Sequence, residues 1–233
     1  MHKLILLAAS AMAVTACTNA SYGPAENRST ESAGLIAARH LDVTGDAEMA
    51  GVLVQANGTV GRDLDLAGAR VDSSTAVGGD LSAAGASVRF TGSVGGNAEI
   101  AAATTWLDAD FGGDLDVAGA RVTIDGRVAG RLQLHGARMN LKGDFLGPVE
   151  VIGEGRDDGE RIRNGRAILA GSFAQTAFVC ATHVEFRQSA RFAGELRVIA
   201  SELRVIASER PEGGPADYNF ELLDGRDCDK IDL

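Results

Sequence analysis

Apolar and polar residues alternate through the middle of the chain, and this alternation repeats at a constant step of seventeen residues. Half a unit, from Ala33 to Val43, precedes six units that follow one another without insertion or deletion. The six units are 44–60, 61–77, 78–94, 95–111, 112–128 and 129–145. A fixed period of this kind predicts a repeat architecture in which each unit forms one structural layer.

One unit, GGDLDVAGARVTIDGRV at residues 112–128, shows how a layer is built. Positions 1 to 17 of the repeat are counted from its first glycine. Large apolar residues occupy positions 4, 6, 11, 13 and 17, which here are Leu115, Val117, Val122, Ile124 and Val128. Side chains alternate between the two faces of a strand, so this spacing predicts strands. Two or three glycines per unit would each cost a helix about 1 kcal/mol, which argues against a helical repeat.

The alternation continues from one unit into the next and predicts a closed coil. Positions 11, 13, 15, 17, 2, 4 and 6 share one face, and we place a single break in the alternation between positions 6 and 9. Position 9, which is mostly Ala, is then expected to face inward. Three short strands and three tight corners, where Gly or Ala relieves backbone crowding, make one turn of a triangular parallel β-helix. Successive turns, called rungs below, stack at about 4.8 Å.

The repeat becomes less regular after residue 145 but does not end there. Residues 154–166, EGRDDGERIRNGR, interrupt it and are expected to form a charged loop protruding from a corner; their Asp157, Asp158 and Glu160 are the acids considered for chemistry below. The pattern then resumes and includes a duplicated heptad, ELRVIAS, at 195–201 and 202–208. We therefore expect one all-β domain over residues 33–209, with roughly eight rungs and a length of about 40 Å.

The tail, residues 210–233, differs from the repeat because it is rich in acidic residues. It also contains apolar residues that are expected to pack over the open end of the coil, namely Tyr218, Phe220, Leu222 and Leu223. The tail is thus expected to cap the coil.

The first residues are typical of a bacterial lipoprotein signal peptide. Lys3 precedes an apolar run that is too short to span a bilayer and ends in Val14-Thr15-Ala16-Cys17. Small residues leading into a cysteine favour cleavage after residue 16 and lipidation of Cys17; an ordinary signal peptide with a chance cysteine is the alternative. Residues 17–32 then form a polar tether. Thr18, in place of Asp, favours the outer membrane, and we expect its periplasmic face.

Charge excludes one class of partner. The chain has 22 basic and 32 acidic residues. Loss of Lys3 with the signal peptide leaves 21 basic residues, so the mature net charge is 21 − 32 = −11. An acidic protein of this kind is not expected to bind nucleic acid. Attachment to the membrane would come from the lipid chains on Cys17, and more than one chain is needed for stable anchoring.

The pattern GGDLxxAGAxVxIxGxV over residues 33–209 resembles the bactofilins, a polymer-forming cytoskeletal family of bacteria. The resemblance implies a triangular β-helix that polymerises end to end without nucleotide. Three features depart from the family pattern: the predicted export and lipidation, the charged insertion, and a tail that could close the end needed for polymerisation. Polymerisation therefore does not follow from the fold.

Candidate chemical groups are few. No histidine has a second His or Cys at metal-ligand spacing, so no metal or other cofactor is expected. Acids recur at position 3, where they either bind Ca²⁺ or, as we favour, hydrogen-bond their own turn. Arginines at position 10 are expected to pair with acids at position 5, or to form a polysaccharide-binding stripe; they are Arg70, Arg121 and Arg138. Trp106 is expected to face outward, at an assembly contact or against a sugar.

Two cysteines remain after Cys17, and an even pair outside the cytoplasm favours a disulfide. Cys180 is expected in an inward-facing strand and Cys228 in the tail, so the bond would fix the tail to the last rungs; a buried free Cys180 is the alternative.

These observations favour a lipid-anchored, bactofilin-like scaffolding protein of the cell envelope that is not an enzyme and that either associates with itself end to end or presents a rigid rod. The alternative is a polysaccharide-binding or polysaccharide-active β-helix, for which the 154–166 insertion offers the only clustered acids and arginines. An adhesin stalk is a third possibility.

Overall fold

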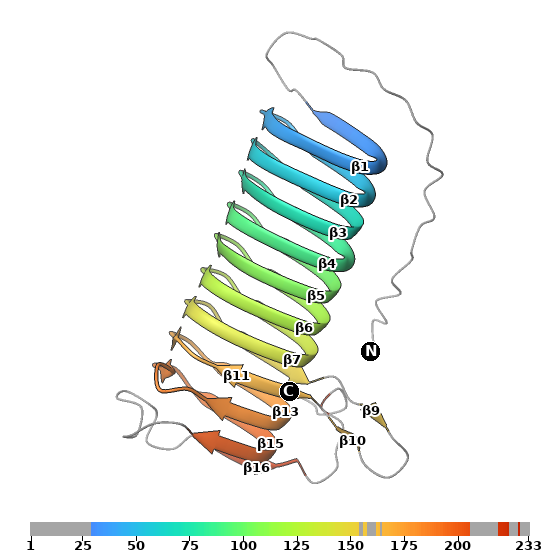
Figure 1. The fold of residues 1–233 in the computed structure, drawn as a ribbon. Coiled ribbons are helices and arrows are strands. Elements are labelled where there is room, and N and C mark those ends of the chain that lie inside the picture. Colours follow the sequence, from blue (N-terminus) through green and yellow to red (C-terminus); the bar gives the residue numbers. More distant parts are fainter. Residues whose placement is uncertain are drawn as a thin grey trace, which may run out of the picture.

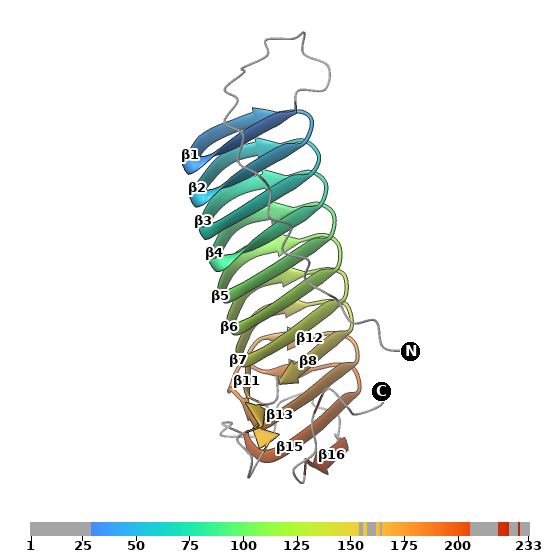
Figure 2. The same ribbon diagram turned by 90° about the vertical axis from the view of Figure 1, so that its right-hand side faces the viewer.

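A computed structural model describes residues 29–153, 156–157, 162–163, 165–205, 219–223 and 228. The described residues form a stack of parallel strands that coil about one long axis, a parallel β-solenoid of about 10 turns (Figures 1 and 2). At about 4.8 Å per rung, ten rungs make a rod about 48 Å long, two rungs longer than expected.

The first seven rungs are continuous strands of equal length. They are β1 (Thr30–Val43), β2 (Ala47–Val60), β3 (Leu64–Val77), β4 (Leu81–Val94), β5 (Ala98–Phe111), β6 (Leu115–Val128) and β7 (Leu132–Phe145). Each pairs in parallel with the next at a shift of seventeen residues, as Leu115 pairs with Leu132. The first strand already begins at Thr30, within the segment expected to be tether.

The last rungs are divided into shorter strands. They comprise β8 (Val149–Gly153), β11 (Arg166–Leu169), β12 (Ser172–Phe173), β13 (Ala177–Phe186), β14 (Arg191–Phe192), β15 (Leu196–Val205) and β16 (Asn219–Leu222). The strands β9 (Arg156–Asp157) and β10 (Ile162–Arg163) pair with each other in antiparallel fashion, outside the main sheet. The insertion is thus a hairpin that leaves the coil between β8 and β11 (Figure 1).

The predicted large inward columns form the core. In β6, Leu115, Val117, Val122, Ile124 and Val128 are all at most 2% exposed. Position 17 becomes aromatic toward the C-terminal end, where the rings of Phe145, Phe173 and Phe192 stack with centroids 5.0 and 4.8 Å apart. The ring spacing equals the rung spacing, so one aromatic column runs along the axis.

The small inward position was predicted wrongly. Ala69, Ala86 and Ala103, at position 9, are exposed, whereas Ala102, at position 8, is buried. The strand ladders also skip position 9, since Gly51 pairs with Gly68 and Leu53 with Arg70. Alternation therefore continues through position 8, and the corner lies at position 9.

A second corner lies at position 15, where Gly92 and Gly143 both have φ +129°. A Cβ on Gly92 would lie 2.0 Å from the carbonyl oxygen of Thr75 in the preceding rung, so the approach of neighbouring backbones selects glycine there. The third bend occupies positions 1–3, between consecutive long strands. Three bends per rung confirm the expected coil.

Candidate functional site

The acids at position 3 join one rung to the next. The backbone N–H of Asp80 donates to Asp63 Oδ1 at 2.9 Å, and that of Asn97 donates to Asp80 Oδ1 at 2.7 Å. The column continues until Arg131 N donates to Asp114 Oδ1 at 2.8 Å. The prediction that each Asp would bond its own turn is therefore wrong, because the acceptor serves the following rung. In the part of the chain that the structure describes, no group of three metal-ligating side chains forms.

The same bonds explain the Gly-Gly-Asp motif. A Cβ on Gly96, at position 2, would lie 2.1 Å from Asp80 Oδ1, so the carboxylate occupies the space of the missing side chain. The column ends at Arg131, whose side chain offers no acceptor to the next rung. Position 3 of that next rung is Pro148, which has no N–H to donate, so no backbone donor is left without its acceptor there. The acids at position 3 therefore serve to connect neighbouring rungs.

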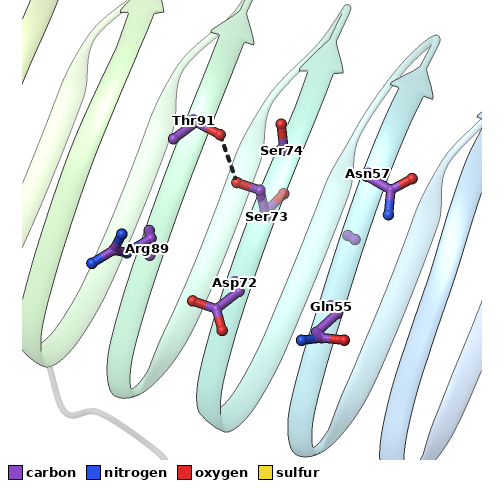
Figure 3. Close-up of a pocket in the computed structure, with 8 residues that line it drawn as sticks. Gln55, Asn57, Asp72, Ser73, Ser74, Arg89 and Thr91 are labelled. Carbon is purple, nitrogen blue, oxygen red and sulfur yellow. Dashed lines mark hydrogen bonds between the residues drawn. The ribbon is translucent and has the colours of Figure 1, made fainter.

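A polar face lies on the outside of rungs 2 to 5, along positions 12 and 14. Figure 3 shows the position-12 and position-14 side chains of β2, β3 and β4 in two parallel rows. They line a shallow pocket of about 360 Å³, formed by Gln55, Ala56, Asn57, Asp72, Ser73, Ser74, Arg89 and Thr91. Amide, carboxylate, guanidinium and hydroxyl groups thus recur at the rung spacing on a flat wall.

Trp106 borders this pocket. It stands at position 12 next to Arg89, whose Cζ lies 4.6 Å from the ring centroid. The cation–π contact fixes the guanidinium over the indole face. Trp106 is half-buried, so part of the ring remains open to solvent.

The arginines at position 10 do not form the expected pairs. Arg70 Nε lies 2.7 Å from Asp72 Oδ2, at position 12 of its own strand, and not beside an acid at position 5. No ion pair is formed by Arg121 or Arg138 with any described residue. The corner at position 9 lies between positions 5 and 10, so the two columns are on different walls.

One further ion pair lies at position 14. Lys142 Nζ donates to Asp125 Oδ2 at 2.5 Å. This hydrogen bond, together with the charge of Asp125, raises the pKa of Lys142 above its ordinary value. Lys142 therefore keeps its proton to a higher pH than an isolated lysine would.

A buried carboxylate lies near the insertion. Glu185, at position 12 of β13, is 4% exposed and contacts two arginines, with Arg166 Nη2 on Oε2 and Arg187 Nε 2.9 Å from Oε1. The periodic pattern gave no signal for this cluster, since position 12 is an outward position. Asp157, Asp158 and Glu160, the acids considered for a catalytic role, have side chains outside the described part, so the clustered charge that is seen is Glu185 with its arginines.

The disulfide between Cys180 and Cys228 is confirmed, with Cα atoms 5.7 Å apart. The expected inward orientation of Cys180 is wrong. Val179 and Ala181 face the core, whereas Cys180 belongs to a second cluster on the outer wall with Ile152, Phe178, Ile199, Leu223 and Cys228. Leu223 and Cys228 of the tail therefore pack against the outside of the last rungs.

The two ends of the rod differ. At the C-terminal end β16 pairs with residues 197–200 of β15, so among the described strands it adds only part of a rung. Val205, Phe220 and Leu222 stand in inward columns there, yet they are 41%, 42% and 59% exposed. At the N-terminal end the inward positions of β1 include Thr30, Ser32 and Arg39, which are polar.

Comparisons with protein-family models, curated proteins and solved structures found no match to this chain. Cys17 lies outside the described residues. The described residues contain no helix that is long and apolar enough to cross a bilayer. A functional argument therefore rests on the rod, its ends and its polar face.

Proposed function

We propose that this protein is a lipid-anchored structural element of the bacterial cell envelope, held through Cys17 at the periplasmic face of the outer membrane. In this proposal it resembles the bactofilins in fold and in associating through an end of the rod. The rod supplies rigidity because every rung is hydrogen-bonded to its neighbours along its length, which suits a scaffold or spacer better than a mobile binding module.

The observation that carries the proposal is the apolar surface exposed at the C-terminal end among the described residues. Apolar side chains that would be buried in any inner rung are exposed in the last one, at Val205, Phe220 and Leu222. The strand β15 also has an unpaired edge beyond residue 200 among the described strands. Exposed apolar surface beside an open strand edge favours pairing with another chain.

Contact between two C-terminal ends fits these ends better than contact between unlike ends. The N-terminal end presents Thr30, Ser32 and Arg39 in the corresponding columns, and these polar groups would lose hydration against Phe220 and Leu222. Two copies meeting through the same apolar surface give a closed, two-fold dimer. A longer polymer would then need a second contact elsewhere.

The test uses the mature chain with Cys17→Ser, which removes the acylation site. Light scattering and negative-stain microscopy should show dimers about twice the length of one rod, or filaments. Phe220→Asp should reduce the species to monomers, because a charge would be buried in the contact. Leu35→Asp, an exposed apolar position at the other end, is the matched control and should leave association unchanged. A strict monomer at high concentration contradicts the association part of the proposal.

The polar face supports a second candidate function, binding of an envelope polysaccharide. The specific observation is the row of hydrogen-bonding groups beside Arg89 and Trp106, since glycans are bound through such groups and through aromatic rings (Figure 3). In cosedimentation with purified cell-wall polysaccharide, the affinity of the Arg89→Ala variant for the polysaccharide should be at least about tenfold lower. Arg127→Ala, an exposed arginine at position 16, is the control; equal binding by both variants contradicts this candidate.

A further inference from the structure

The corner at positions 9 and 10 is apolar in the first two rungs only. Leu35 and Ile36 occupy it in β1, and Val52 and Leu53 occupy it in β2. The later rungs carry Ala followed by Arg, Ser or Thr, at Ala69-Arg70, Ala86-Ser87, Ala103-Thr104, Ala120-Arg121 and Ala137-Arg138. The repeat itself therefore shows that this corner needs no large apolar side chain in order to fold.

These side chains are open to solvent. Leu35 is 79% exposed, Ile36 is 68% exposed and Val52 is 56% exposed. Position 9 is the unpaired corner residue of the ladder, so its side chain points away from the core. Because the two rungs stack directly, the aliphatic groups form one continuous patch at the end of the rod. An exposed patch that the fold does not require marks a contact with something apolar.

The chain itself indicates what that contact is. Only eleven residues, 18–28, lie between Cys17 and Ser29, which enters the first rung. Even fully extended, that length spans about 40 Å at most, less than the length of the rod. A lipid on Cys17 would therefore keep the first rungs within that distance of the bilayer, whereas the last rungs can lie farther away.

We propose that the apolar corner of β1 and β2 inserts into the surface of the phospholipid bilayer and seats the N-terminal end of the rod there. The inference rests on the proposed lipid anchor at Cys17. Aliphatic side chains gain free energy when they leave water for the interface between headgroups and acyl chains. The first rung carries both signs of charge, Glu31, Arg39 and Asp42, so the contact does not require anionic lipid.

A second copy of the chain suits this corner less well. Stable protein interfaces bury about 1,200–2,000 Å² with close shape complementarity, and a convex corner of a few aliphatic side chains offers far less. A bilayer needs no complementary shape. Once the acyl chains hold the corner nearby, a small apolar contact is enough to fix how the rod stands on the membrane.

The test uses the lipidated full-length protein in vesicles of phosphatidylcholine with brominated acyl chains, which quench tryptophan only on contact. Trp106→Phe removes the native tryptophan, and Leu35→Trp places the reporter in the patch. Ala103→Trp places it at the same position 9 four rungs farther on, in an exposed corner, and is the matched control. Circular dichroism checks that both variants keep the fold, and flotation with the vesicles checks the anchor.

We expect the fluorescence of Leu35→Trp to be quenched at least about twofold, and that of Ala103→Trp to be unchanged. Salt at about 0.5 M should not alter the quenching, because salt screens charges and not apolar contacts. If the protein floats with the vesicles but neither reporter is quenched, the seating inference is wrong while the anchor stands. If Leu35→Trp is blue-shifted without quenching and the protein dimerises in detergent, the corner binds a second copy and the inference is again wrong. Failure to float would instead contradict the lipid anchor in the proposed function.

Discussion

Neighbouring rungs are held together by different contacts in β1–β7 and in the part of the coil from β8 onward. The first set repeats one geometry, with glycine at two of the three corners and a side-chain acceptor at position 3 that binds the next rung, as in Asp80 and Asn97. The second set has lost that column at Pro148 and has an inserted hairpin. It relies instead on individual links: the aromatic stack of Phe145, Phe173 and Phe192, the buried Glu185, and the Cys180–Cys228 disulfide.

The difference teaches where each half is vulnerable. In the regular half every rung repeats the same small contributions, so a change matters when it violates the backbone geometry that all rungs share. In the C-terminal half a few specific contacts replace the periodic ones, so loss of a single link should affect its own rungs and leave the rest of the stack intact.

The largest expected effect is loss of the disulfide, in the double variant Cys180→Ser and Cys228→Ser. The bond closes a chain separation of 48 residues, which corresponds to about 4 kcal/mol of stabilisation by the loop-entropy relation. Hydrogen exchange should show lost protection in β13, β15 and β16, with β2–β6 unchanged. An equal loss of protection along the whole rod would mean that the two halves are not energetically separate.

In the regular half the strongest effect is expected from Gly92→Ala. The new Cβ would meet the Thr75 carbonyl oxygen at 2.0 Å, at a φ of +129° that alanine disfavours. We expect a cost of about 2–3 kcal/mol, measured by urea unfolding. The control is Ala109→Gly at the same position 15, where a Cβ is already accommodated, with an expected cost below about 1 kcal/mol. Similar costs for both would mean that corner geometry is not what limits this half.

A stabilising change is expected from Thr105→Val. Thr105 stands at position 11, where β2, β3, β4 and β6 carry valine, and its buried hydroxyl has no hydrogen-bond partner among the described residues. Replacement by valine should raise the free energy of unfolding by about 1 kcal/mol. Ser73→Ala is the opposite case, because the Ser73 hydroxyl lies 2.9 Å from that of Thr75, and its loss should destabilise. Thermal unfolding of both variants distinguishes them.

The smallest effect concerns the position-3 column. Asp80→Ala should cost about 1 kcal/mol, because the backbone N–H of Asn97 loses its acceptor. Asp80→Asn should be close to neutral, since Asn97 already provides an amide oxygen in the same role, to Asp114 N at 2.9 Å. Chemical denaturation of the two variants makes the comparison. An equal cost for both would show that charge, and not the inter-rung hydrogen bond, is what the column supplies.

Periodicity was sufficient to predict the parallel coil, the length of a rung and the five large inward columns. These follow from the sequence because a two-residue alternation of large apolar side chains has only one face that can be buried. The small inward position could not be decided in this way. Glycine at position 8 and alanine at position 9 are both small enough for either side, and only the skipped ladder partner at position 9 places the corner.

The last rungs show the same limit for a different reason. Around Cys180 the residues of both parities are apolar, with Ala177, Val179 and Ala181 inside and Phe178 and Cys180 outside, so alternation carries no information about direction. The sequence favoured the right disulfide partners, since only two cysteines follow Cys17. It could not place the bond on the outer wall, because that depends on how Leu223 and Cys228 pack against several rungs at once.

The amino-acid sequence by itself determined what is local and periodic: strands, corners and the step of seventeen. The tertiary structure alone decided what lies between rungs and at the ends. The Asp80 side chain meets Asn97, and Glu185 meets Arg166, only after the coil has brought distant residues together. The exposed ends exist for the same reason, since a rung is buried by its neighbours, and the terminal rungs lack one.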